Sequence, residues 1–259
     1  MNTEKNSYTV VFAVGMVVVV GAILAFLASF LKPTITENQR LEKQQNILYA
    51  LGINENTDGS AVFVSKDKAP QAFTDNVKEQ IVLTVDPNGK IIKTQTREEY
   101  IAETNQEPYL IDVKKQQDAA KAGKNRLMPL FVGEKDGEKF YVAPIRGKGL
   151  WDAIWGYVAV DKNMVVTGAY FDHKGETPGL GANIKQRYFM DDFIGEHLKD
   201  KSGNYKGITV SKSNADPTNN DKEDNEVDAI AGATITGDGV SAMIKKDLGL
   251  YVPYFQGLN

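Results

Sequence analysis

The stretch IVLTVDPNGKIIKT at residues 81–94 indicates how the folded body of this chain is built. Two β-rich segments, residues 81–85 and 90–94, flank the turn sequence DPNG. Pro87 presets the backbone φ for a turn and Gly89 accepts a positive φ, so the two segments are predicted to pair as a β-hairpin. We therefore expect neighbouring strands to pair antiparallel.

Similar patterns continue toward the C-terminus. A second hairpin is expected around Asp136 and Gly137, leading into an apolar strand at residues 140–145. Residues 156–160 and 165–171 form another predicted strand pair. Helical patterns occupy residues 183–199 and 239–248, and a polar loop occupies residues 211–226. The body is thus predicted to be α+β and mostly antiparallel.

An apolar segment precedes this body. Residues 10–31 carry no charge and, at about 1.5 Å per residue, span roughly 33 Å as a helix, enough for a bilayer core of about 30 Å. A cleaved signal peptide is the alternative, but the segment is longer than a signal core of about 7 to 15 residues and no clear cleavage site follows it. One N-terminal transmembrane helix is the prediction.

The region after the anchor begins with Pro33, which is expected to end the span. Thr34 and Glu37 then match a capping box that would open a polar stalk helix, closed near Gly52. The apolar residues through which this stalk would pack are Leu41, Ile47, Leu48 and Leu51. The predicted organisation is a tail at 1–9, the transmembrane helix at 10–31, a stalk and membrane-proximal α+β region at 32–125, and a C-terminal domain at 126–259.

Composition excludes several classes of function. A net charge of -4 and the lack of a basic stripe argue against nucleic-acid binding. Zero cysteines exclude disulfides and cysteine-ligated clusters within this chain, and two histidines are too few for most histidine-rich metal sites, so no metal site is expected. Any redox chemistry would thus use an organic cofactor or a partner's metal.

Two segments have compositions that core, strand or amphipathic helix do not explain. In HKGETPGLG at residues 173–181, the glycines let backbone amides approach a planar ligand or phosphate, although an ordinary surface turn would look alike. In DAIAGATITGDG at residues 228–239, small and hydroxyl residues lead into a helix, whose first amides would stabilise a phosphate on Thr234. The alternative there is a plain N-cap threonine.

The sequence DAIAGAT at residues 228–234 resembles the recognition motif of periplasmic flavin transferases, Asp-x-x-(Ser/Thr)-Gly-Ala-Thr. In that motif the final threonine takes FMN through a phosphoester. The resemblance implies that Thr234 is the acceptor, with Thr236 as the alternative. Ala231 departs from the pattern, and modification would be less efficient if the usual hydroxyl helps recognition.

The loop ETPGLG at residues 176–181 is similar to the flavin-contacting loop of the FMN-binding domain family. The resemblance implies that residues 126–259 form an FMN-binding domain. The sequence GLWD at residues 149–152, with Trp155, also resembles a family segment near the cofactor, although both tryptophans would suit a hydrophobic core equally well. By this resemblance the residues near the flavin are Trp151, Glu176, Thr177, Leu180, Gly181, Gly232 and Ala233.

The whole chain resembles the family of C subunits of the sodium-translocating NADH:quinone oxidoreductases. This implies an electron carrier with no catalytic residue of its own, in a complex of six subunits that couples NADH oxidation by ubiquinone to Na⁺ export, and a flavin transferase as maturation partner. It also implies a single-pass protein of the bacterial inner membrane with its FMN domain in the periplasm. The basic residues point the other way, because Lys32, Arg40 and Lys43 follow the span and only Lys5 precedes it.

Three other functions remain open from the sequence. The G subunit of the Rnf electron transport complex is related, but it is usually shorter between anchor and flavin loop, so residues 52–126 favour the sodium-translocating family. A non-redox extracytoplasmic binding module would carry no flavin. A separate flavin reductase with dissociable FMN would need a nucleotide-binding motif, and no Gly-x-Gly-x-x-Gly follows a predicted strand.

Overall fold

The computed structural model describes residues 6–57, 59–135, 137–212 and 219–258. The chain forms two compact units, residues 1–42 and 43–259. The second unit contains every strand that the described residues form.

The first long element is the helix α1, Asn6–Ala50, which belongs to the first unit up to residue 42. Its apolar part has a mean hydropathy of 3.0 and is exposed, so by length and composition it suits a membrane span. The expectation that a separate stalk helix opens after Pro33 is wrong, because α1 continues through this residue. A proline removes one backbone hydrogen bond, and Thr36 supplies a further bond nearby by donating to the carbonyl of Lys32 at 2.9 Å.

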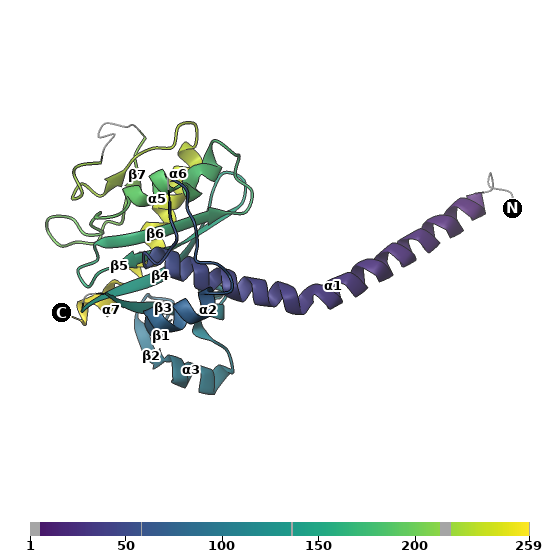
Figure 1. Cartoon of the computed structure of the whole chain (residues 1–259), viewed down its shortest axis with the longest axis horizontal. Helices are drawn as coiled ribbons and strands as arrows, with labels where there is room; N and C mark the ends of the chain where they lie inside the picture. The colour runs from purple at the N-terminus through teal and green to yellow at the C-terminus, as the bar shows by residue number, and fades with distance from the viewer. Residues whose placement is uncertain (1–5, 58, 136, 213–218, 259) are drawn as a thin grey trace. The chain divides into compact units, whose positions relative to one another are not determined.

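The second unit is built on one antiparallel sheet with the strand order β2-β1-β3-β4-β5-β6 (Figure 1). The strands are β1 Val77–Val85, β2 Ile91–Thr96, β3 Arg126–Lys135, β4 Glu138–Lys148, β5 Ala153–Val160 and β6 Val166–His173. The hairpin predicted at residues 81–94 is confirmed, with Gly89 at a φ of 84°. The pairing of residues 156–160 with 165–171 is also confirmed. The pairing of β3 with β4 confirms the second hairpin, although Asp136 lies outside the described residues.

Short helices and a small second sheet surround these strands. The helical elements are α2 Ala69–Asn76, α3 Arg97–Thr104, η1 Pro108–Leu110, α4 Val113–Lys121, η2 Gly181–Lys185, α5 Arg187–Asp192, α6 Thr234–Met243, the π-turn Ile244–Leu248 and α7 Val252–Gln256. The strands β7 Thr209–Val210 and β8 Glu226–Val227 pair parallel. The α+β class predicted from the sequence is confirmed.

The core of the second unit lies between the sheet and its helices. The end of α1 contributes Ile47 and Leu48, which are fully buried, and Leu51 packs against the same cluster. Phe171 of β6, with Phe189 and Phe193 from α5 and its C-terminal end, forms an aromatic cluster with ring centroids 5.0 to 5.8 Å apart. The stalk predicted to pack through apolar residues thus contributes to the core through its C-terminal turns.

Three helix predictions need correction. A capping box occurs not at Thr34 but at Thr96, where α3 begins. The helix predicted at residues 183–199 is two short segments, because Gln186 is extended and Gly195 has a φ of 89°. The helix predicted at residues 239–248 begins earlier, at Thr234. Gly237 and Gly239 lower its helix propensity, but Gly239 packs so closely on β4 that a Cβ there would lie 2.3 Å from a carbonyl oxygen.

Candidate functional site

The two segments singled out in the sequence meet around one cavity of about 240 Å³. The segment at residues 173–181, here called the flavin loop, follows β6, and the second segment leads into α6, so the two are far apart in sequence. The lining residues are Leu150, Glu176, Thr177, Leu180, Gly181, Gly232, Ala233, Thr234, Ile235 and Thr236. All of the predicted site residues except Trp151 line this cavity.

Thr234 is the first residue of α6 and is exposed. Ala233 occupies the N-cap position and no side chain caps the helix, so the N-cap threonine considered as an alternative is wrong. The first amides of a helix have no intrahelical acceptor and carry the positive end of the helix dipole. The hydroxyl of Thr234 therefore stands where a phosphate would be stabilised.

Thr236 lies two residues further along α6 but has a different environment. It is only 1% exposed, and its hydroxyl donates to Oε2 of Glu176 at 2.6 Å. A transferase cannot reach a hydroxyl that is buried and engaged in this way without opening the structure. Of the two threonines, Thr234 alone is accessible for modification.

Glu176 is buried, and its carboxylate is held by protein donors from two directions. Besides the hydroxyl of Thr236, it accepts from the backbone amide of Trp151 at 2.9 Å and from those of Leu150 and Asp152 at 3.4 Å each. Burial raises the pKa of Glu176, but the hydrogen bonds from Thr236 and from the three amides together hold it below its ordinary value. An ionised Glu176 thus joins the loop at residues 149–152 to α6.

Two glycines permit the close approach of the segments. A Cβ on Gly181 would lie 2.5 Å from Oγ1 of Thr236 and 2.6 Å from Oε2 of Glu176. Gly232 has a φ of 71°, and a Cβ there would lie 2.9 Å from Leu180. A larger residue at Gly181 would disturb the hydrogen bond between Thr236 and Glu176. At Gly232 it would strain the backbone at a positive φ and displace the end of the Leu180 side chain.

Three apolar side chains of the cavity lining around Thr234 are exposed to solvent. Leu150 is 47% exposed, Leu180 is 41% exposed and Ile235 is 57% exposed. Leu150 and Ile235 were not among the predicted site residues, although both lie inside segments quoted from the sequence. The sequence signal that could have identified them is a large apolar residue within an otherwise glycine-rich or polar segment. Such a rim is what the apolar ring of a flavin would contact.

Trp151 is 67% exposed, so the core position considered for it is wrong. Its indole Nε1 donates to Oγ1 of Thr177 at 3.2 Å, which places it beside the flavin loop but not in the cavity lining. Trp155 lies in β5, opposite Arg146 and Asp172, and is half-buried. Trp155 does not line the cavity either.

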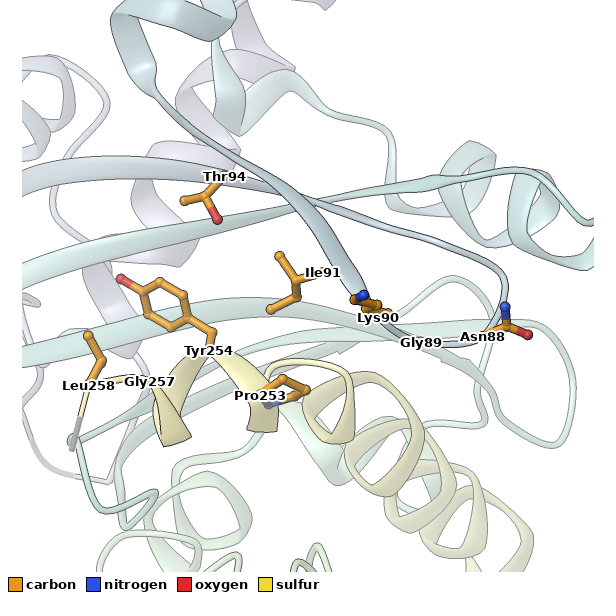
Figure 2. A pocket seen from close by; sticks show the side chains of 9 residues that line it. All are labelled: Asn88, Gly89, Lys90, Ile91, Thr94, Pro253, Tyr254, Gly257 and Leu258. Atoms are coloured by element: carbon orange, nitrogen blue, oxygen red, sulfur yellow. The ribbon is translucent and has the colours of Figure 1, made fainter.

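A larger cavity of about 680 Å³ lies between the turn after β1 and the helix α7 (Figure 2). Figure 2 shows Ile91 and Tyr254 facing this space from the two sides. None of the predicted site residues contributes to its lining. Within the described ranges, no group of three or more His, Cys, Asp or Glu residues is placed to hold a metal ion.

The loop at residues 149–152, the flavin loop and α6 all fall within a match to a known family. Residues 149–249 match the family model of the FMN-binding domain. The chain is 29% identical to the C subunit of the Na(+)-translocating NADH-quinone reductase of Pseudomonas aeruginosa, covering 96% of this chain and 93% of that protein. It is 28% identical to the corresponding protein of Neisseria meningitidis serogroup A, covering 99% and 96%.

Solved structures give the same result. The crystal structure of the C subunit from Parabacteroides distasonis superposes with a TM-score of 0.67 and 31% identity, covering 88% of this chain and 98% of that chain. The structure of the Shewanella oneidensis protein superposes with a TM-score of 0.60 at 24% identity, and shows a shared fold.

Proposed function

Because this chain belongs to the family of C subunits of the Na(+)-translocating NADH-quinone reductases, we propose that it carries electrons within such a complex, on FMN joined to Thr234 by a phosphoester. The observation that carries the proposal is the contrast between the two threonines of α6. Thr234 is exposed at the helix start and lines the cavity, whereas the hydroxyl of Thr236 is buried against Glu176.

The residues present fit this cofactor. Gly181 and Gly232 leave space that a Cβ would fill, and the exposed side chains of Leu150, Leu180 and Ile235 offer apolar contacts. The cavity of about 240 Å³ is smaller than the roughly 300–1,000 Å³ of most ligand pockets, so it would enclose only part of FMN. When bound, FMN accepts and releases electrons, and a partly exposed flavin suits exchange with another protein.

The residues around the cavity would have different roles in holding the flavin. The first amides of α6 would hold the phosphate on Thr234. Glu176 fixes the flavin loop and the 149–152 loop through its four hydrogen bonds, so its charge positions the site. Thr177 orients the indole of Trp151, which borders the site. In this proposal FMN supplies the redox chemistry and the chain acts as an electron relay.

The family also supports a location and partners. We propose that α1 anchors the chain as a single pass in a bacterial inner membrane, with residues 43–259 in the periplasm. Its partners would be the five other subunits of a complex of six that couples NADH oxidation by ubiquinone to Na⁺ export. A flavin transferase would attach the FMN, and the exposure of Ala231, Gly232 and Thr234 makes the motif reachable by such an enzyme.

The proposal is tested by fluorescence of the denatured protein under ultraviolet light after expression with a flavin transferase. The wild-type chain and a Thr236→Ser variant are expected to give a fluorescent band, because the serine keeps the hydroxyl bonded to Glu176. Thr234→Ala is expected to give none. A fluorescent Thr234→Ala protein, or a wild-type protein without fluorescence, would overturn the proposal.

A further inference from the structure

A second cavity of about 520 Å³ lies beside the proposed flavin site, and several basic side chains line it. These come from α4, from the end of β4 and from the turn after α6: Lys114, Lys121, Arg146, Lys148 and Lys246. Within the described part of the chain, the only carboxylate in the lining is Asp152. We call this cavity the basic cleft. It stands out in a chain whose net charge is -4.

The positive charge of the basic cleft is poorly compensated within the protein. Asp152 already pairs with Lys174 at 2.8 Å, and Lys121 pairs with Asp118 at 3.4 Å. Among the described residues, Lys114, Lys148 and Lys246 have no carboxylate within ion-pair distance. Several like charges held near one another are unfavourable unless an anion offsets them, so the cleft attracts negative charge.

The basic side chains stand on fixed elements. Beneath them Asp247, which is fully buried, accepts from Arg126 at 3.0 Å, from Gln117 at 3.0 Å and from the backbone amide of Arg146 at 2.9 Å. Gln117 also donates to the carbonyl of Arg146 at 2.7 Å. These bonds join α4, β3, β4 and the turn after α6, so the walls of the cleft are braced.

The basic cleft and the proposed flavin site share structural elements. The helix α6 begins at Thr234 in the flavin cavity, and Gly239, Ala242 and Met243 further along it line the basic cleft. Trp151 lines the cleft and bonds to Thr177 of the flavin loop. An anionic group in the basic cleft would therefore lie close to Trp151 and the flavin loop.

Resting on the proposed function, we infer that the basic cleft docks an acidic surface of the protein that exchanges electrons with this flavin. The cations come from three separate elements, and no described residue of the lining has a hydroxyl side chain that would complete a compact site for one phosphate. A broad acidic surface matches this distribution better. Complementary charge around a redox site steers partners and fixes their orientation.

The test uses the assembled membrane complex with a matched pair of double variants. Lys114→Glu with Lys246→Glu reverses two charges of the basic cleft. Lys115→Glu with Lys245→Glu is the control, because these residues are their chain neighbours, are exposed and do not line the cleft. Both pairs change the net charge equally. Covalent flavin is measured in every sample by fluorescence of the denatured chain.

Two readouts are expected to agree. Carbodiimide, which joins a lysine to a carboxylate with loss of water, should link Lys114, Lys148 or Lys246 to an Asp or Glu of another chain, as mapped by mass spectrometry. Quinone-reductase turnover at low salt should fall roughly tenfold in the cleft variant only, and the difference should shrink near 1 M salt as charges are screened.

The inference is overturned if cleft and control variants have equal turnover and no link from the cleft lysines reaches another chain. It is equally overturned if only the cleft variant loses binding to phosphatidylglycerol vesicles while no protein link forms, because the cleft would then contact lipid. Absence of flavin in the wild-type chain would instead refute the proposed function. The cross-links, which need no flavin, would separate the two failures.

Discussion

Glu176 is the residue on which the geometry of the flavin cavity depends most. Its carboxylate is so close to Gly181 that a Cβ on this glycine would clash with it. The same carboxylate accepts from the hydroxyl of Thr236 and from the amides of residues 150–152. The resemblance in sequence predicted Glu176 to lie near the flavin. It did not reveal that the carboxylate is taken up by protein donors, because these come from segments 24 to 60 residues away in sequence.

We expect Glu176→Gln to loosen the site. The amide nitrogen of glutamine would face a donor in place of one carboxylate oxygen, and a buried donor left unpaired costs about 1–3 kcal/mol. The free energy of unfolding of the full chain in detergent should fall by about this amount, and the fraction carrying covalent flavin should decrease. Glu223→Gln is the control, since Glu223 is exposed. Unchanged stability and flavin content would show that Glu176 has no positioning role.

At the scale of elements, the buried carboxylate of Asp247 joins α4, β3 and β4 to the turn after α6. Its pairing with Arg126 is almost wholly buried, with side-chain exposures of 0% and 6%. Asp247→Asn leaves the guanidinium of Arg126 without a counter-charge, and breaking a buried pair from one side typically costs about 3–5 kcal/mol. Chemical denaturation of the full chain should show a loss of this size. A loss below about 1 kcal/mol would contradict the account.

Residues 213–218 of the predicted polar loop lie outside the described residues, but Asn219 and Lys222 further along it contact Glu196. Burial raises the pKa of Glu196 to about 7, although Asn219 and Lys222 oppose this and Asp224 adds to it. Because the folded state holds this proton at pH values where the unfolded chain has lost it, stability should fall as pH rises from about 4.5 to about 7. Glu196→Gln should flatten this part of the profile of thermal unfolding against pH. If the variant and the wild-type chain have the same profile, the pKa of Glu196 is not raised in the folded state.

The strands were predictable from local sequence, and the helices were less so. The DPNG turn and the alternating segments identify the strand pairs because a hairpin is decided by residues close in sequence. The course of α1 through Pro33 and the early start of α6 depend on more than local propensity. In α6 the packing of Gly239 on β4 overrides a glycine-rich sequence that disfavours helix.

At the scale of the molecule, the second unit contains its own hydrophobic core and both of the cavities that carry proposals. We expect a fragment of residues 43–259 to fold without residues 1–42 and to remain in solution without detergent. Its thermal unfolding should match that of the full chain within a few degrees, and both should accept flavin from a transferase. Aggregation or loss of cooperative unfolding would show that the first unit is needed for folding.

The combination of an apolar helix, an α+β body and a flavin motif was visible in the sequence because each is encoded locally. The cavity between the flavin loop and α6, and the basic cleft beside it, were not. Both arise from contacts between distant segments, such as the bond between Thr236 and Glu176 or the gathering of lysines from α4 and the turn after α6.

The intact mass of the chain, produced with and without a flavin transferase, tests most directly whether Thr234 carries FMN. We predict an added mass equal to FMN minus one water, mapped by peptide analysis to Thr234 and lost in Thr234→Ala. An adduct on Thr236 or elsewhere, or an unmodified chain in the presence of an active transferase, would contradict the account.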